Sequence, residues 1–146
     1  MTSPESSGAS TGTLAGEYFA WHARREFRLQ RCQRCKRWTH PPTEMCAACG
    51  SVEMAWERAS GEGILYTWTV THHPYTAPLA EFVPYPLVVV QCAEGPRVLS
   101  TVMDLEGASL TPGMALTVRF AAVGGGPLRA VFAPVAAQEP DGLARR

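Results

Sequence analysis

The chain has 146 residues, of which 46% are hydrophobic and 18% are charged, an ordinary composition for one globular domain or two small lobes. Its 13 basic and 13 acidic side chains balance, so no overall charge attracts nucleic acid or an anionic membrane. Because the N-terminus lacks the segments of a secretory signal and no apolar run approaches the roughly 20 residues of a membrane span, we expect a soluble, cytoplasmic protein.

The composition divides the chain into four segments. Residues 1–16 and 136–146 hold few large apolar side chains, so we expect both to be disordered tails. Residues 17–53 hold a short predicted helix and four of the five cysteines. Residues 54–135 show the alternating pattern of β-strands and predict a barrel.

A short amphipathic helix is predicted over residues 17–25, because four side chains recur there at helical spacing: Tyr18, Phe19, His22 and Ala23. Its aromatic content requires a surface to pack on. Seven basic residues lie between positions 24 and 37 against one acid, Glu26. Such a charge run is most often a solvated face, and the alternative is a binding site for phosphate or for an acidic partner.

Two Cys-x-x-Cys pairs follow, made by Cys32, Cys35, Cys46 and Cys49. Each short turn can aim two sulfurs at one metal, and together they predict a tetrahedral four-thiolate zinc site. Iron in the same cage, redox pairs and disulfides are the alternatives, and a reducing compartment disfavours the last. Four thiolates leave no open coordination position, so the zinc is expected to be structural.

Two further positions near these pairs carry expectations. Gly50, directly after the second pair, fits a turn that needs a positive φ. Cys92 stands alone in a β-rich run, and we expect it to be a small buried hydrophobic residue.

Turn residues separate five β-rich runs, which follow a short first run at 54–59: residues 63–72, 87–93, 97–103, 115–123 and 128–133. This count fits a five-stranded OB-fold barrel, although another small barrel or sandwich fits nearly as well on spacing. Gly61 and Gly63 would allow a bend at the entry of the first long strand.

No catalytic motif of a familiar enzyme class occurs in the sequence. His72 and His73 end a predicted strand with no nucleophile or paired carboxylate nearby, so we interpret them as an exposed strand end. The loop over residues 74–86 holds four prolines and the aromatic residues Tyr75, Phe82 and Tyr85. A loop this long is often functional, and the alternative is a loop folded over its own core.

Several short motifs occur in a specific order: Arg28-Leu29-Gln30-Arg31-Cys32, Cys46-x-x-Cys49-Gly50-Ser51, Ser60-Gly61-x-Gly63-x-x-Tyr66, Pro84-Tyr85-Pro86 and Gly113-Met114-x-Leu116. From Tyr18 to Pro134 the chain resembles an acyl-CoA-associated family that was long catalogued only as a domain of unknown function. The resemblance implies a mainly β fold with a short N-terminal helix, a rubredoxin-like zinc ribbon and a five-stranded OB-fold barrel. All four metal positions match, and Arg37 stands close to where members often have glycine.

The resemblance also implies a function. Members of this family associate with thiolase-superfamily enzymes, including lipid-transfer-protein-like thiolases that act as aldolases on steroid side-chain CoA esters, and others are fused to hydratase-like domains. The thiolase-like subunit supplies the chemistry, while the zinc-ribbon and OB-fold subunit bridges subunits and helps form the acyl-CoA channel. The implied function is a non-catalytic accessory subunit with acyl-CoA as the ligand of the complex.

On this hypothesis the helix and the basic ribbon bind the partner enzyme. Arg28 and Arg31 are expected to meet CoA phosphates, and Tyr75, Phe82 and Tyr85 to line the acyl site. The main alternative is a nucleic-acid-binding module, since zinc ribbons and OB folds both occur in that role, but zero net charge opposes it. An independent enzyme is the weakest hypothesis, because no catalytic constellation is present.

Overall fold

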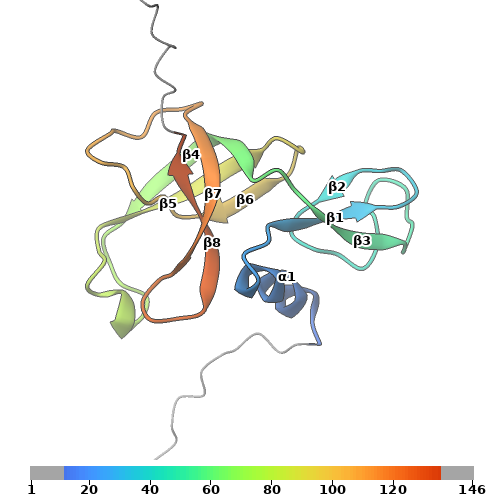
Figure 1. The fold of residues 1–146 in the computed structure, drawn as a ribbon, viewed down its shortest axis with the longest axis horizontal. Helices are drawn as coiled ribbons and strands as arrows, with labels where there is room; N and C mark the ends of the chain where they lie inside the picture. Colours follow the sequence, from blue (N-terminus) through green and yellow to red (C-terminus); the bar gives the residue numbers. More distant parts are fainter. Residues whose placement is uncertain (1–11, 136–146) are drawn as a thin grey trace, which may run out of the picture.

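The computed structural model describes residues 12–135, which form one α-helix and two antiparallel sheets (Figure 1). The elements in chain order are α1 (Leu14–Ala23), β1 (Arg28–Cys32), β2 (Trp38–Thr39), β3 (Met54–Arg58), β4 (Glu62–Thr71), the 3-10 helix η1 (Ala77–Leu79), β5 (Tyr85–Cys92), β6 (Arg97–Ser100), β7 (Ala115–Ala122) and β8 (Leu128–Pro134). The first sheet has the order β2-β1-β3, and the second has the order β6-β5-β4-β7-β8. This arrangement confirms the mainly β fold with a zinc ribbon and a curled five-stranded OB-fold sheet.

The helix α1 begins earlier than the sequence predicts. The prediction placed a helix at residues 17–25 after a tail that ended at residue 16, but Thr13 acts as the N-cap: its hydroxyl accepts a hydrogen bond from the Gly16 N–H at 3.0 Å. The helix ends at Ala23. Arg25, the residue after the C-cap, has a left-handed φ of 57° and turns the chain away from the helix. The remaining tail predictions, for residues 1–11 and 136–146, lie outside the described residues.

The strand β3 belongs to the first sheet, although the sequence pattern placed it with the barrel. It pairs with β1 along five residues, from Arg28 opposite Arg58 to Cys32 opposite Met54. The chain leaves the second cysteine turn beside β1, so pairing with this neighbour satisfies the backbone of β3. The chain then crosses to the barrel near Gly61, whose carbonyl accepts a hydrogen bond from the Val118 N–H. The chain therefore passes from the first sheet to the second between Arg58 and Glu62.

The strand β4 is the centre of the barrel sheet and pairs with both β5 and β7. Its register with β5 shifts between Leu65 and Thr67, so the irregularity lies beyond Gly61 and Gly63, where the sequence placed a bend. At the entry itself, Gly61 has a φ of 78°, which L side chains rarely adopt, and both glycines also allow close packing. A Cβ on Gly61 would lie 2.4 Å from Val118 Cγ1, and one on Gly63 would lie 2.7 Å from the Gln91 carbonyl oxygen.

The substitution Gly63→Ala is expected to lower the free energy of unfolding by about 1–3 kcal/mol, because the neighbouring strand must shift to make room. Gly12→Ala is a matched control, since an added Cβ there meets nothing within 4 Å, and it should change stability by less than about 0.5 kcal/mol. Urea unfolding measures both. Equal free energies of unfolding in the two variants would show that β5 can move away from residue 63 without loss of stability.

One hydrophobic core joins the two lobes. It combines barrel side chains such as Leu65 and Phe132 with Tyr18 of α1 and Phe27 ahead of β1. The Phe27 and Phe132 rings meet edge to face with centroids 6.0 Å apart. Figure 1 shows α1 at the junction, where it contacts both β8 and β1. The helix thus finds its packing surface on its own chain.

Three single residues lie where the sequence predicts. Cys92 is buried in β5, and His72 and His73 are exposed just after β4. Within residues 12–135, no helix has the length and apolar character needed to cross a bilayer.

Candidate metal centre and adjoining cavity

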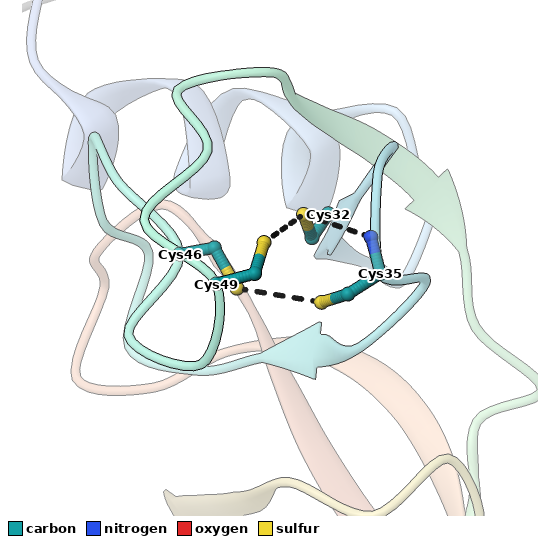
Figure 2. A group of neighbouring side chains, drawn as sticks. All are labelled: Cys32, Cys35, Cys46 and Cys49. Atoms are coloured by element: carbon teal, nitrogen blue, oxygen red, sulfur yellow. Dashed lines mark hydrogen bonds between the residues drawn. The ribbon is translucent and has the colours of Figure 1, made fainter.

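The four predicted metal ligands meet at one point. Their Sγ atoms all lie within 4.8 Å of one another, and Figure 2 shows the side chains facing each other between two loops. The Sγ atoms of Cys32 and Cys49 are 3.6 Å apart, as are those of Cys35 and Cys46. A tetrahedral site with Zn–S bonds of about 2.3 Å has edges of about 3.8 Å, whereas a disulfide bond is about 2.05 Å long. The spacing therefore fits four thiolates around one ion.

Two equivalent turns aim these sulfurs. The N–H of Lys36 donates to the carbonyl of Cys32 at 2.9 Å, and the N–H of Gly50 donates to that of Cys46 at 2.8 Å. Both turns close with a positive φ, 64° at Lys36 and 72° at Gly50. The positive φ predicted for Gly50 is confirmed. In the first turn, Lys36 takes the equivalent position and the same backbone conformation, although it is not a glycine.

The sulfurs lie among backbone N–H groups that favour thiolates. The N–H of Cys35, 3.5 Å from Cys32 Sγ, lowers the pKa of Cys32 to about 6, and the N–H groups of Cys49 and Ala48 lower the pKa of Cys46. The N–H of Arg37 also lowers the pKa of Cys35, but burial and the neighbouring sulfurs outweigh it and raise that pKa to about 11. Four adjacent sulfurs ionise together only around a cation, so this donor set fits structural Zn²⁺.

The predicted phosphate ligands have their guanidinium groups engaged within the fold. Arg28 Nε lies 2.6 Å from Glu26 Oε2, and its guanidinium lies 4.3 Å from the centre of the Trp21 ring. Arg31 Nε donates to the carbonyl of Lys36 at 2.8 Å and lies 3.6 Å from Glu57 Oε2. Both guanidinium groups are thus engaged with neighbouring side chains or carbonyls, and neither arginine lines the large cavity beside α1.

A cavity of about 770 Å³ lies between α1, the loop that follows β4 and the hairpin of β7 and β8. Phe82 and Tyr85 line it, whereas Tyr75 does not and is 90% exposed. The structure therefore gathers the four cysteines in one place and two of the three predicted loop aromatics in another. Arg28, Arg31 and Tyr75 join neither group.

The sequence analysis missed the two histidines and the arginine that line this cavity, namely His22, His40 and Arg129. The sequence placed His22 only on the apolar face of a helix. Its spacing of four residues from Tyr18 was the one signal that these two side chains lie on the same face. Arg129 and His40 lie in different lobes and share no local pattern, so only the folded chain brings them together.

Comparisons with known proteins identify the two lobes. Residues 20–55 match the family model of the ChsH2 rubredoxin-like zinc ribbon domain, and residues 56–121 match that of the ChsH2 C-terminal OB-fold domain. A chain of the solved Ltp2-ChsH2(DUF35) aldolase superposes with a TM-score of 0.72 at 28% identity, over 81% of this chain and 91% of that one. The chain belongs to the ChsH2 (DUF35) family. The resemblance drawn from the sequence is confirmed, and the four cysteines form the zinc ribbon of this ChsH2-type chain.

Three further proteins are similar to the chain, either at low identity or over only part of their own length. A DUF35 protein of unknown function from Sulfolobus solfataricus has the same fold, with a TM-score of 0.58 at 13% identity over 87% of this chain and 89% of that one. A probable enoyl-CoA hydratase alpha subunit of Thermomonospora curvata is 30% identical over 122 residues, which are 84% of this chain and 38% of that protein. A DUF35 domain-containing scaffold protein of Pyrococcus furiosus is 36% identical over 74 residues, 51% of this chain and 54% of that one. The chain thus spans only 38% and 54% of the length of these two curated relatives.

Proposed function

We propose that the chain is a non-catalytic accessory subunit of a thiolase-like acyl-CoA enzyme, either an aldolase or a thiolase. In this role it bridges subunits and helps form the acyl-CoA site. The observation that carries the proposal is the likeness to a chain of the Ltp2-ChsH2(DUF35) aldolase over 91% of that chain's length. Its name joins two components, and the Pyrococcus relative is named a scaffold protein. The family resemblance extends the proposal to steroid side-chain CoA esters.

The metal centre supports an accessory role. Four thiolates fill the coordination sphere of a tetrahedral ion, so no position is left for a substrate or an activated water. The ribbon has four cysteines placed to hold one metal ion, and it presents exposed basic side chains. Such a lobe is suited to binding a partner or an anionic ligand rather than to turnover.

Three basic residues of the ribbon are better placed to meet CoA phosphates than the two that the sequence singled out. Arg34, Lys36 and Arg37 are exposed, and their side chains form no ion pair with another described residue. A free guanidinium can form charge-assisted hydrogen bonds with phosphate at no loss to the fold. We therefore assign the phosphate contacts to the tip of the ribbon.

The double substitution Arg34→Gln and Arg37→Gln is expected to weaken acyl-CoA binding by the complex about tenfold or more, because charge-assisted hydrogen bonds are lost. Arg119→Gln is the matched control, since Arg119 is exposed on β7, away from the ribbon. Isothermal titration of the complex measures both. An equal affinity in the two variants would remove the ribbon tip from the CoA site.

Purification of the tagged chain from its native cells tests the proposal as a whole. We expect a thiolase-superfamily subunit to co-purify in stoichiometric amount, and the reconstituted pair to turn over an acyl-CoA that neither part alone converts. Recovery of nucleic acid with a steep salt dependence, and no thiolase-like subunit, would favour the nucleic-acid module instead. Turnover by the isolated chain would show that it is an enzyme in its own right.

A further inference from the structure

The cavity beside α1 has the size and the walls of a small-molecule site. Its volume of about 770 Å³ falls within the range of about 300–1,000 Å³ typical of ligand pockets. Most of its lining is aromatic or aliphatic and includes Tyr18, Phe19, Phe82 and Val131. Residues His40 to Pro42 close it from the ribbon side, so both lobes build its wall.

A buried hydrogen-bond donor lies in this apolar wall. His22 is only 2% exposed, and its Nδ1 accepts a hydrogen bond from the Ala130 N–H at 3.3 Å. An accepting Nδ1 carries no proton, so the neutral imidazole has its proton on Nε2. Within residues 12–135, Nε2 has no hydrogen-bond partner. A buried donor without a partner costs about 1–3 kcal/mol. Nε2 itself has almost no accessible surface, so a ligand oxygen recovers this cost once the ring shifts toward the cavity.

One cation also lines the cavity. The guanidinium of Arg129 lies 3.7 Å from the centre of the Phe19 ring, and among the described residues no acidic side chain pairs with it. The cavity thus has a positive charge in its apolar lining, together with His22, whose Nε2–H is buried at the wall. This combination complements an oxygen acceptor that carries partial or full negative charge.

We infer that this cavity binds the apolar body of the acyl group, and that an oxygen of that ligand accepts a hydrogen bond from His22 Nε2. The identity of the ligand as an acyl group rests on the proposed function, whereas the preference for an apolar molecule with one oxygen acceptor comes from the cavity itself. A nucleotide does not suit it, because several phosphates would face a single cation. The acyl and nucleotide ends of acyl-CoA therefore meet different parts of the chain, the cavity and the ribbon tip.

Binding of 11-(dansylamino)undecanoic acid to the zinc-loaded full chain, without its partner, tests this inference. The carboxylate of the probe stands in for the oxygen acceptor, and its chain and dansyl ring stand in for the apolar body. We expect saturable binding with a rise in dansyl fluorescence. In histidine-labelled protein, the ¹⁵N resonance of His22 Nε2 should shift when the probe binds.

Two variants locate the probe. Ala121→Trp places a large ring in the cavity from β7 and should weaken binding about tenfold or more. Ala115→Trp on the same strand lies outside the cavity lining and should change the dissociation constant by less than about twofold. His22→Phe keeps the ring but removes the donor, so it should weaken binding about fivefold.

The outcomes separate the cavity from the partner. Absence of saturable binding, or equal binding by Ala121→Trp and Ala115→Trp, would overturn the cavity inference even if a thiolase-like subunit co-purifies. Binding that fails only in Ala121→Trp and His22→Phe, with no thiolase-like partner recovered, would leave an apolar ligand site and overturn the proposed function alone.

Discussion

Replacement of Cys46 by serine is expected to abolish stoichiometric zinc binding and to unfold the ribbon lobe. Cys46 is 1% exposed, and its sulfur lies 3.6 Å from Cys35 Sγ in the four-sulfur cluster. The ribbon sheet has only three short strands, so a small lobe of this kind depends on its metal. Structural zinc contributes about 10–16 kcal/mol of apparent binding free energy in zinc-finger peptides. Metal analysis by mass spectrometry and amide NMR measure the two effects.

Cys92→Ala provides the matched control for this substitution. Cys92 is the one cysteine outside the cluster, and its burial in β5 raises the pKa of its thiol to about 12. Its removal leaves a small void that costs about 1 kcal/mol, with the zinc retained. Zinc that remains bound in Cys46→Ser, or a ribbon that stays folded after chelation of the wild-type chain, would contradict a structural metal.

The metal site could be predicted from the sequence because its geometry is local. Each cysteine turn spans a few residues, and the positive φ at Gly50 follows from the same short turn. The strands of the barrel could likewise be predicted, since apolar and polar residues alternate over short stretches of β4 and its neighbours. The early start of α1 escaped because one side-chain hydrogen bond, from Gly16 to Thr13, decides it.

Features that depend on distant residues could not be predicted in the same way. The strand β3 pairs with β1, which lies on the other side of the cysteine segment in the sequence. The residue pattern within β3 does not indicate this pairing. Arg28 and Arg31 count as free charges in a sequence, yet Glu26 and Glu57 face them in the folded chain. The hydrogen bond between His22 and Ala130 joins residues 108 positions apart. The cavity therefore exists only once α1 has packed on β8.

Acidification is expected to destabilise the chain through His22. Burial, then the charges of Arg129 and His40, lowers the pKa of His22 from 6.5 to about 4. Between these two pH values the unfolded state binds a proton that the folded state does not, so stability falls as the pH falls. The loss should reach about 1 kcal/mol near pH 5.5 and about 3 kcal/mol near pH 4, below which it levels off.

The variant His22→Phe isolates this contribution, because it keeps a ring among Tyr18, Phe27 and Phe120 but cannot take up a proton. Urea unfolding of both proteins at neutral pH and near pH 5.5, with zinc content measured alongside, gives the difference directly. His40, whose pKa burial also lowers, and the thiolates of the ribbon are common to both proteins, so the difference reports His22 together with its interaction with His40. A wild-type chain that loses no more stability than His22→Phe over this range would show that His22 is protonated or solvated in the folded state, and the buried neutral donor would be lost with it.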